Sequence, residues 1–130
     1  MIVVDTSALA AIYRRENDDN LYRGRISKSD ELRLPIHVYV EFSRLRRYGQ
    51  PRRWLDMAIK EHRLVLTGLD PVIAYIAAQA SDSYGKGTGH PARLNFGDCL
   101  SYAVAKHLGA PLLFKGDAFT HTDIESALAA

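Results

Sequence analysis

A helix and a strand follow one another in residues 95–117, which read NFGDCLSYAVAKHLGAPLLFKGD. We expect a helix from Phe96 to Leu108, because Gly109 after it is a typical helix end. The apolar run Pro111–Phe114 is then expected to form a strand, and it is followed by Lys-Gly-Asp. One such pair does not define a fold, but the same alternation recurs throughout the chain.

Three more short apolar runs are predicted strands: Ile2–Val4, Leu32–Leu34 and Leu64–Leu66. Helices are expected between them. Thr6 and Ser7 offer an N-cap for the first helix, a polar helix or turn lies within about residues 16–28, and further helices span 36–48, begin at Pro51 and span 71–84. This alternation predicts a central parallel sheet covered by helices on both faces, a three-layer α/β/α fold.

Composition limits the class of protein. The chain has 130 residues, of which 47% are hydrophobic and 25% charged, which suits one globular domain over residues 1–130. A formal net charge of +2 permits nucleic-acid binding without requiring it. The single cysteine, Cys99, excludes an internal disulfide framework and a cysteine-rich zinc site.

The same features indicate a location. No stretch approaches the roughly 20 apolar residues of a membrane span, and the N-terminus lacks the basic start of a secretory signal. With its one cysteine, such a chain is suited to a reducing compartment. We therefore expect a cytoplasmic protein with no membrane partner.

Four acids are predicted to gather at one edge of the sheet. Asp5 directly follows the first strand, and Asp117 comes shortly after the last one. Asp98 lies in the first turn of the helix before that last strand, and Glu41 lies in the helix after the second. Because ligands of open parallel sheets bind beyond the carboxyl ends of the strands, these side chains are candidates for one site.

Each acid also has a purely structural explanation. Asp5 could assist in capping the first helix, Asp98 is favoured by the helix dipole, and Asp117 could be a turn residue. Glu41 falls on the apolar side of its helix near Val38, where an ion pair with a nearby arginine or a position at the edge of the apolar stripe would accommodate it.

Together the four acids favour a metal site. Carboxylates that share a cleft repel one another, and their pKa values rise unless a cation neutralises them. Oxygen ligands without cysteine favour Mg²⁺, or Mn²⁺ in its place, over zinc. Such a site is suited to the hydrolysis of a phosphodiester.

Three segments carry a resemblance to a known family: MIVVDTSAL at the start, VYVEFSRL around Glu41, and NFGDCLSYAVAKHLGAPLLFKGDAF near the end. The sequence resembles the PIN domain family and, within it, the VapC-type toxins of bacterial toxin–antitoxin pairs. The resemblance covers essentially the whole chain. It implies a PIN fold, a metal-dependent endoribonuclease activity on RNA, neutralisation by a VapB-type antitoxin, and a homodimer.

The resemblance also implies residue roles. Asp5 and Asp98 would be the principal Mg²⁺ ligands, with Asp117 close behind, and Glu41 would act through water or orient the nucleophile. Relatives often carry a second acid after the Lys-Gly-Asp, where this chain has Ala118. The contribution of a further acid such as Asp123 is therefore open.

Two polar residues complete the site that the resemblance implies. Ser7 and Asn95 would provide hydrogen bonds that orient Asp5 and the water molecules on the metal. His37 and His62 have no partners at metal-ligand spacing, so we interpret them as core or surface residues.

Five arginines crowd the end of the Glu41 helix and the start of the next: Arg44, Arg46, Arg47, Arg52 and Arg53. They are candidates to hold an RNA backbone beside the acids, because phosphate contacts dominate nucleic-acid affinity. The alternative is an ordinary solvated helix face.

Two other functions compete with the nuclease. A receiver-like phosphoacceptor domain is also a parallel α/β fold, and it would use an acid after the first strand and a lysine after a late one, a place that Lys115 fits. A PIN-like module could also bind RNA or a partner without cleaving.

Overall fold

The computed structural model describes residues 1–129. Its centre is a parallel four-stranded sheet in the order β3-β2-β1-β4. The strands are β1 (Ile2–Val4), β2 (Leu32–Pro35), β3 (Leu64–Thr67) and β4 (Leu112–Leu113).

Six α-helices surround the sheet: α1 (Thr6–Tyr13), α2 (Asp19–Ser27), α3 (Ile36–Ser43), α4 (Pro51–His62), α5 (Pro71–Tyr84) and α6 (Phe96–Leu108). Two short 3-10 helices, η1 (Arg46–Tyr48) and η2 (Ala118–His121), complete the elements. No helix within residues 1–129 has both the length and the apolar character needed to cross a bilayer.

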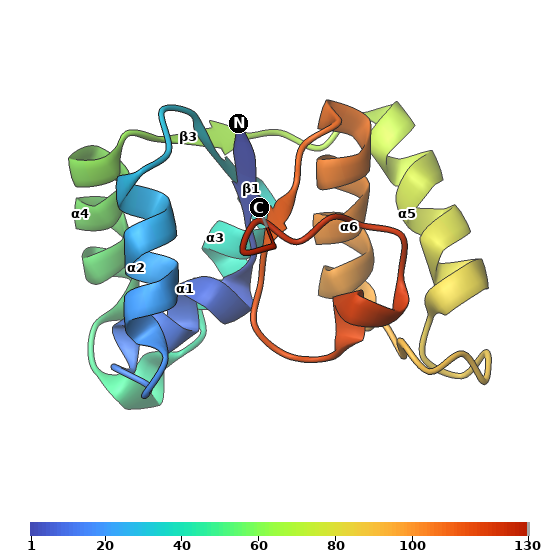
Figure 1. The fold of residues 1–130 in the computed structure, drawn as a ribbon, viewed down its shortest axis with the longest axis horizontal. Helices are drawn as coiled ribbons and strands as arrows, with labels where there is room; N and C mark the ends of the chain where they lie inside the picture. The colour runs from blue at the N-terminus through green and yellow to red at the C-terminus, as the bar shows by residue number, and fades with distance from the viewer. Residues whose placement is uncertain (130) are drawn as a thin grey trace.

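The sheet separates two apolar cores. Ile2 and Val4 of β1 pack into one core with α1 to α4, whereas Val3 between them packs into the other with α5 and α6. Figure 1 shows the two groups of helices on opposite sides of β1. The three-layer α/β/α architecture expected from the sequence is therefore confirmed.

Three helices bring their ends to the C-terminal edge of the sheet. α1 follows β1 directly, and α3 begins at the residue after β2. α6 connects to β4 through Gly109 and two more residues, so it runs opposite to the strands and its first turn lies at that same edge. Acids at the ends of these elements can meet there (Figure 1).

The helix expected over residues 36–48 is shorter than predicted. α3 ends at Ser43, and η1 then takes the chain from Arg46 to Gly49, where φ is +105°. The Tyr13 hydroxyl donates a hydrogen bond to the backbone oxygen of Tyr48 at 2.5 Å and ties η1 to α1. This tertiary contact overrides the local helical pattern.

Two strands also differ from the expectation. The predicted strand 111–114 contains only Leu112 and Leu113 as β4, since proline at 111 has no backbone N–H to donate. β3 is an edge strand, and Val65 and Leu66 are 46% and 49% exposed although their sequence is that of a buried strand. In the core that contains α1 to α4, Phe42 is fully buried, and its ring contacts Tyr13 and Trp54 at centroid distances of 5.4 Å each.

Candidate active site

Asp5 ends β1 and caps α1. The residue is only 4% exposed, and its Oδ2 accepts hydrogen bonds from the backbone nitrogen and the hydroxyl of Ser7, at 3.1 and 2.6 Å. Thr6 is already the first residue of the helix, so the N-cap is Asp5 and not the Thr6-Ser7 pair expected from the sequence. Because only one oxygen is used for capping, the structural role leaves the other available.

Glu41 is half-buried on α3. The Thr6 hydroxyl donates a hydrogen bond to its Oε1 at 2.9 Å, and no ion pair joins it to an arginine within the described residues, contrary to the ion pair considered from the sequence. Burial raises the pKa of Glu41 above its usual range, and the negative charges of Asp5 and Asp98 raise it further.

Asp98 is held by a capping box at the start of α6. Its backbone nitrogen donates to Asn95 Oδ1 at 2.8 Å, and its Oδ2 accepts from the backbone nitrogen of Asn95 at 3.0 Å. Burial raises the pKa of the Asp98 carboxyl, and the charge of Asp5 adds to this effect. Asp98 therefore completes the capping box of α6, whose N-cap is Asn95, and is also a neighbour of Asp5.

Gly97 brings α6 against Glu41. A Cβ atom on Gly97 would lie 2.2 Å from Glu41 Oε2 and 2.7 Å from its Cδ. The absence of a side chain is therefore what allows the first turn of α6 to approach α3 so closely. The sequence contains a signal for this contact, a glycine inside a helical turn, but the spacing of the acids does not point to it.

Asp5, Glu41 and Asp98 thus form what we call the carboxylate cluster. Each keeps one oxygen open: within residues 1–129, no hydrogen bond reaches Asp5 Oδ1, Glu41 Oε2 or Asp98 Oδ1. Within residues 1–129, no group of three or more His, Cys, Asp or Glu side chains could hold a metal ion as the side chains stand.

Within residues 1–129, no hydrogen bond joins Asp117 to the carboxylate cluster. Asp117 is exposed in the segment after β4, and its charge is not among those that raise the pKa values of Glu41 and Asp98. The segment nevertheless reaches the site, because the backbone nitrogen of Lys115 donates to the Ser7 hydroxyl at 3.0 Å. Ser7 therefore joins the end of β4 to Asp5.

Asp123 contacts α6 at another place. The Tyr102 hydroxyl donates to its Oδ1 at 2.5 Å and the Lys106 ammonium to its Oδ2 at 2.8 Å. The bonds from Lys106 and Tyr102 hold the pKa of Asp123 below its usual value. Both of its oxygens are thus engaged in fastening the C-terminal segment to α6.

Lys115 does not reach the carboxylate cluster with its side chain. Its ammonium group pairs with Glu16 and, at 2.8 Å, with Asp18 Oδ1, both in the connection from α1 to α2. A phosphoacceptor site of the receiver kind needs this lysine beside the acid. The receiver alternative is therefore not favoured.

His37 is a neighbour of the site that the sequence motifs do not identify. Its ring is half-buried between α3 and α6, and Nε2 lies 2.9 Å from the hydroxyl of the fully buried Ser101. Burial lowers the pKa of His37 below its usual value, against the opposing effect of the Asp5 charge. A single histidine with no partner at motif spacing gives no signal for this position.

The five arginines lie on the surface beyond α3. Arg44 is close enough for its charge to lower the pKa of Glu41, against the larger effect of burial. Arg46, Arg52 and Arg53 line a surface hollow of about 250 Å³ at the start of α4. None of the five forms an ion pair with a carboxylate in the part of the chain that the structure describes.

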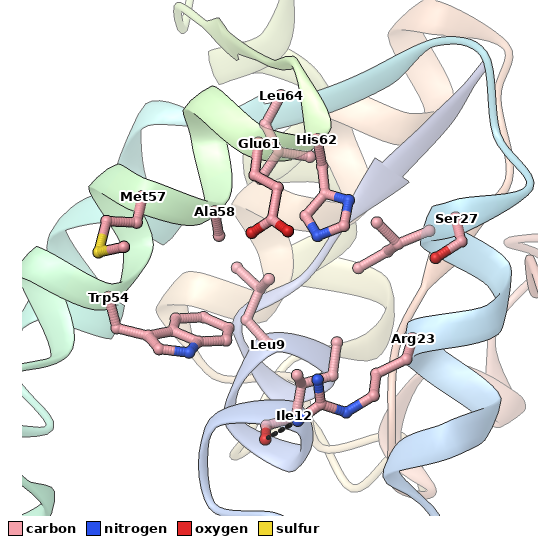
Figure 2. Close-up of a pocket in the computed structure, with 11 residues that line it drawn as sticks. Leu9, Ile12, Arg23, Ser27, Trp54, Met57, Ala58, Glu61, His62 and Leu64 are labelled. Atoms are coloured by element: carbon pink, nitrogen blue, oxygen red, sulfur yellow. Dashed lines mark hydrogen bonds between the residues drawn. The ribbon is translucent and has the colours of Figure 1, made fainter.

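A larger hollow of about 370 Å³ lies elsewhere, between α1, α2 and α4. Figure 2 shows apolar side chains such as Leu9 and Trp54 in its wall, with Glu61 and His62 at one side and Arg23 at another. The guanidinium of Arg23 donates to the backbone oxygen of Ile12 at 3.2 Å (Figure 2). No member of the carboxylate cluster lines this hollow.

Fold and site together define an α/β protein with an acidic cluster at the C-terminal edge of a parallel sheet. The family model of the PIN domain matches residues 2–125 of the chain. Ribonuclease VapC42 of Mycobacterium tuberculosis is 41% identical over 129 residues, which are 97% of this chain and 98% of the relative. The chain belongs to the PIN domain family.

Solved structures agree on the fold. The structure of VapC20 of Mycobacterium tuberculosis, described as a sarcin-ricin loop cleaving toxin, matches with a TM-score of 0.72 and 18% identity, over 95% of this chain and 96% of that one. A toxin–antitoxin complex from Klebsiella pneumoniae matches with a TM-score of 0.70 and 14% identity, over 92% of this chain and 90% of that one.

Proposed function

We propose that this protein is a Mg²⁺-dependent endoribonuclease, in which Mn²⁺ can substitute, and that it hydrolyses RNA phosphodiesters at the carboxylate cluster. The observation that carries this proposal is the set of open oxygens on Asp5, Glu41 and Asp98, three acids that come from separate elements. RNA as substrate is supported by the name ribonuclease that a full-length relative carries.

The donor set fits a hard divalent cation. The charge of Asp5 raises the pKa values of both Glu41 and Asp98, so the three groups repel one another, and a cation between them would relieve this repulsion. Open carboxylate oxygens are ligands that Mg²⁺ and Mn²⁺ prefer. Such an ion, when bound, lowers the pKa of a coordinated water and neutralises charge on the phosphodiester oxygens.

The residues at the site would have different roles. Asp5 and Asp98 would hold the ion, with Asp117 contributing from the segment after β4, and Glu41 would orient the attacking water. Ser7 keeps the Asp5 carboxylate in one orientation through two hydrogen bonds, and the capping box with Asn95 does the same for Asp98.

We further propose that the nuclease is the toxin of a toxin–antitoxin pair in the cytoplasm. It would be neutralised by a VapB-type antitoxin and would form a homodimer. The names of the relatives and the fold match to a toxin–antitoxin complex support this assignment. A PIN-like module that binds RNA without cleaving it is the second candidate, and the next experiment separates the two.

The purified protein is expected to cleave fluorescently labelled single-stranded or hairpin RNA when Mg²⁺ or Mn²⁺ is present. Removal of the ion with EDTA should abolish cleavage, because no cation is then present to activate water and neutralise charge on the phosphodiester, and added Mg²⁺ should restore it. Gel electrophoresis of the products measures the rate. Persistent cleavage in EDTA would contradict the metal assignment, and binding without cleavage in Mg²⁺ would favour the non-catalytic module.

The surface arginines are expected to contribute phosphate contacts. Replacing Arg46, Arg52 and Arg53 together with alanine should flatten the dependence of RNA affinity on salt. The slope of log K against log salt should fall by up to about 0.7 for each lost contact, hence by about 2 for three. Fluorescence anisotropy titrations over a series of salt concentrations measure this slope.

A matched control removes three positive charges elsewhere. Lys28, Lys60 and Lys86 are exposed and lie away from the hollow at the start of α4. Their triple alanine variant should retain most of the wild-type slope. Equal slopes for the two triple variants would mean that the arginines belong to an ordinary solvated face.

A further inference from the structure

Phe96 is the most exposed large apolar side chain among those the structure describes, with 83% of its surface accessible. It is the first residue of α6, between Asn95 and Asp98 of the capping box. A large aromatic ring therefore stands in solvent two residues from a member of the carboxylate cluster.

The backbone that carries this ring is held from two sides. The reciprocal hydrogen bonds of Asn95 and Asp98 fasten the turn, at 2.8 and 3.0 Å. Gly97 lies against the Glu41 carboxylate so closely that a Cβ would not fit. The position of Phe96 relative to the cluster is thus defined by the site itself.

An aromatic side chain at position 96 adds little to the stability of the fold. An apolar side chain stabilises a protein in proportion to the area it buries, and Phe96 buries little. Within residues 1–129, Phe96 also has no aromatic ring as a partner. A polar side chain would serve equally well at this solvent-facing first position of a helix.

We propose that Phe96 is a base-stacking residue, on which a nucleobase next to the scissile phosphate of the RNA packs. This inference rests on the proposed nuclease function. A base is separated from its phosphate by one sugar, so a phosphate at the carboxylate cluster places neighbouring bases within reach of a ring two residues from Asp98. An apolar protein surface over Phe96 would desolvate the Asp98 carboxylate two residues away, whereas an RNA strand would bring its phosphate to the cation that this carboxylate would hold.

Stacking on Phe96 would give a weak preference among bases and not a strict sequence specificity. Every base has a π face, so stacking on Phe96 would tolerate any of the four bases and favour those that stack best. Phe96 would position the strand, while the carboxylate cluster acts on the phosphate.

The test measures binding of a labelled 12-nucleotide single-stranded RNA of mixed sequence, by fluorescence anisotropy with Ca²⁺ in place of Mg²⁺, because a hard divalent cation is needed between the carboxylate cluster and a phosphate. Phe96→Ala should weaken binding by about 5-fold to 150-fold, the range that loss of one stacked base represents. Phe96→Trp should restore binding, because tryptophan retains a flat ring, whereas Phe96→Leu should not. Binding by Phe96→Ala as tight as wild type, or full rescue by Phe96→Leu, would overturn the proposal.

Tyr75 provides the matched control. It is another exposed aromatic residue, 74% accessible, near the start of α5. The start of α5 lies at the upper end of the α5–α6 pair in Figure 1, and the start of α6 lies at the lower end. Tyr75→Ala should bind the RNA as the wild type does. A loss equal to that of Phe96→Ala would overturn the assignment, because aromatic residues in general would then account for it.

Two further measurements separate this inference from its alternatives. With Mg²⁺, Phe96→Ala should raise KM for RNA cleavage more than it lowers kcat. If the wild type cleaves RNA and Phe96→Ala has the same KM, the stacking inference is wrong but the nuclease proposal stands. If the wild type does not cleave RNA but its binding still depends on the ring, the nuclease proposal is wrong but the stacking inference stands. A change in oligomeric mass of Phe96→Ala with unchanged RNA affinity would overturn the inference and assign the ring to a protein contact.

Discussion

Replacing Asp5 with asparagine is expected to lower the rate of RNA cleavage by at least about 1000-fold while the protein stays folded. Asparagine retains one oxygen of similar position but loses the negative charge that a divalent cation requires. It is as good an N-cap as aspartate, so the bond from the Ser7 nitrogen can be kept. The free energy of unfolding should change by no more than about 1 kcal/mol, since lost repulsion among the carboxylates offsets the loss of charge in the hydrogen bond from the Ser7 hydroxyl.

The measurements are the rate of RNA cleavage and a urea unfolding curve for the same preparation. Asp70 offers a matched control, because its side chain caps α5 in the same way, accepting a hydrogen bond from the backbone nitrogen of Ile73 at 2.9 Å. Asp70→Asn should cleave RNA at the wild-type rate. If Asp5→Asn does so too, the carboxylate cluster is not the site of the reaction.

Replacing Gly97 with alanine is expected to lower RNA cleavage about 100-fold, the loss that a displacement of about 1 Å in a catalytic group can cause. The new Cβ would lie 2.2 Å from Glu41 Oε2, so the carboxylate must move away and give up its bond from Thr6. Stability should change little, because the better helix propensity of alanine, about 1 kcal/mol, compensates for one lost hydrogen bond of similar value.

Two comparisons test this explanation. Gly24 lies in α2, and a Cβ atom added there would meet nothing within 4 Å, so Gly24→Ala should raise stability without affecting cleavage. In a Glu41→Ala background, Gly97→Ala should cause almost no further loss, since the group that it displaces is gone. Additive losses in the double variant would show that Gly97 acts on something other than Glu41.

The alternation of strands and helices could be predicted from the sequence, because it depends on local signals. The apolar run of β1, the proline at the start of α4 and the glycine after α6 each act within a few residues, and all three boundaries agree with the structure. One exception is α3, which ends at Ser43, where the chain turns into η1, and η1 is tied to Tyr13, a residue 35 positions before Tyr48. A contact between residues so far apart in the chain cannot be predicted from a local sequence pattern.

For the candidate site, sequence spacing was sufficient to place acids at the ends of elements but not to assign their partners. Asp5 is recognisable because it directly follows the first strand, and Asp98 because it lies in the first turn of a helix. An ion pair with an arginine is one structural alternative that the sequence leaves open for Glu41, yet Glu41 accepts its hydrogen bond from Thr6. Lys115 was a plausible phosphate-site lysine until the structure paired it with Glu16 and Asp18.

A parallel α/β domain with acids at the carboxyl ends of its strands follows from the sequence alone, since strand periodicity and helix capping are properties of neighbouring residues. Three features of the site become visible only in the folded chain: which of those acids repel one another, the space that Gly97 leaves for Glu41, and the exposure of Phe96 two residues before Asp98. The physical reason is that electrostatic repulsion and close packing depend on distance in space, which the order of residues along the chain does not specify.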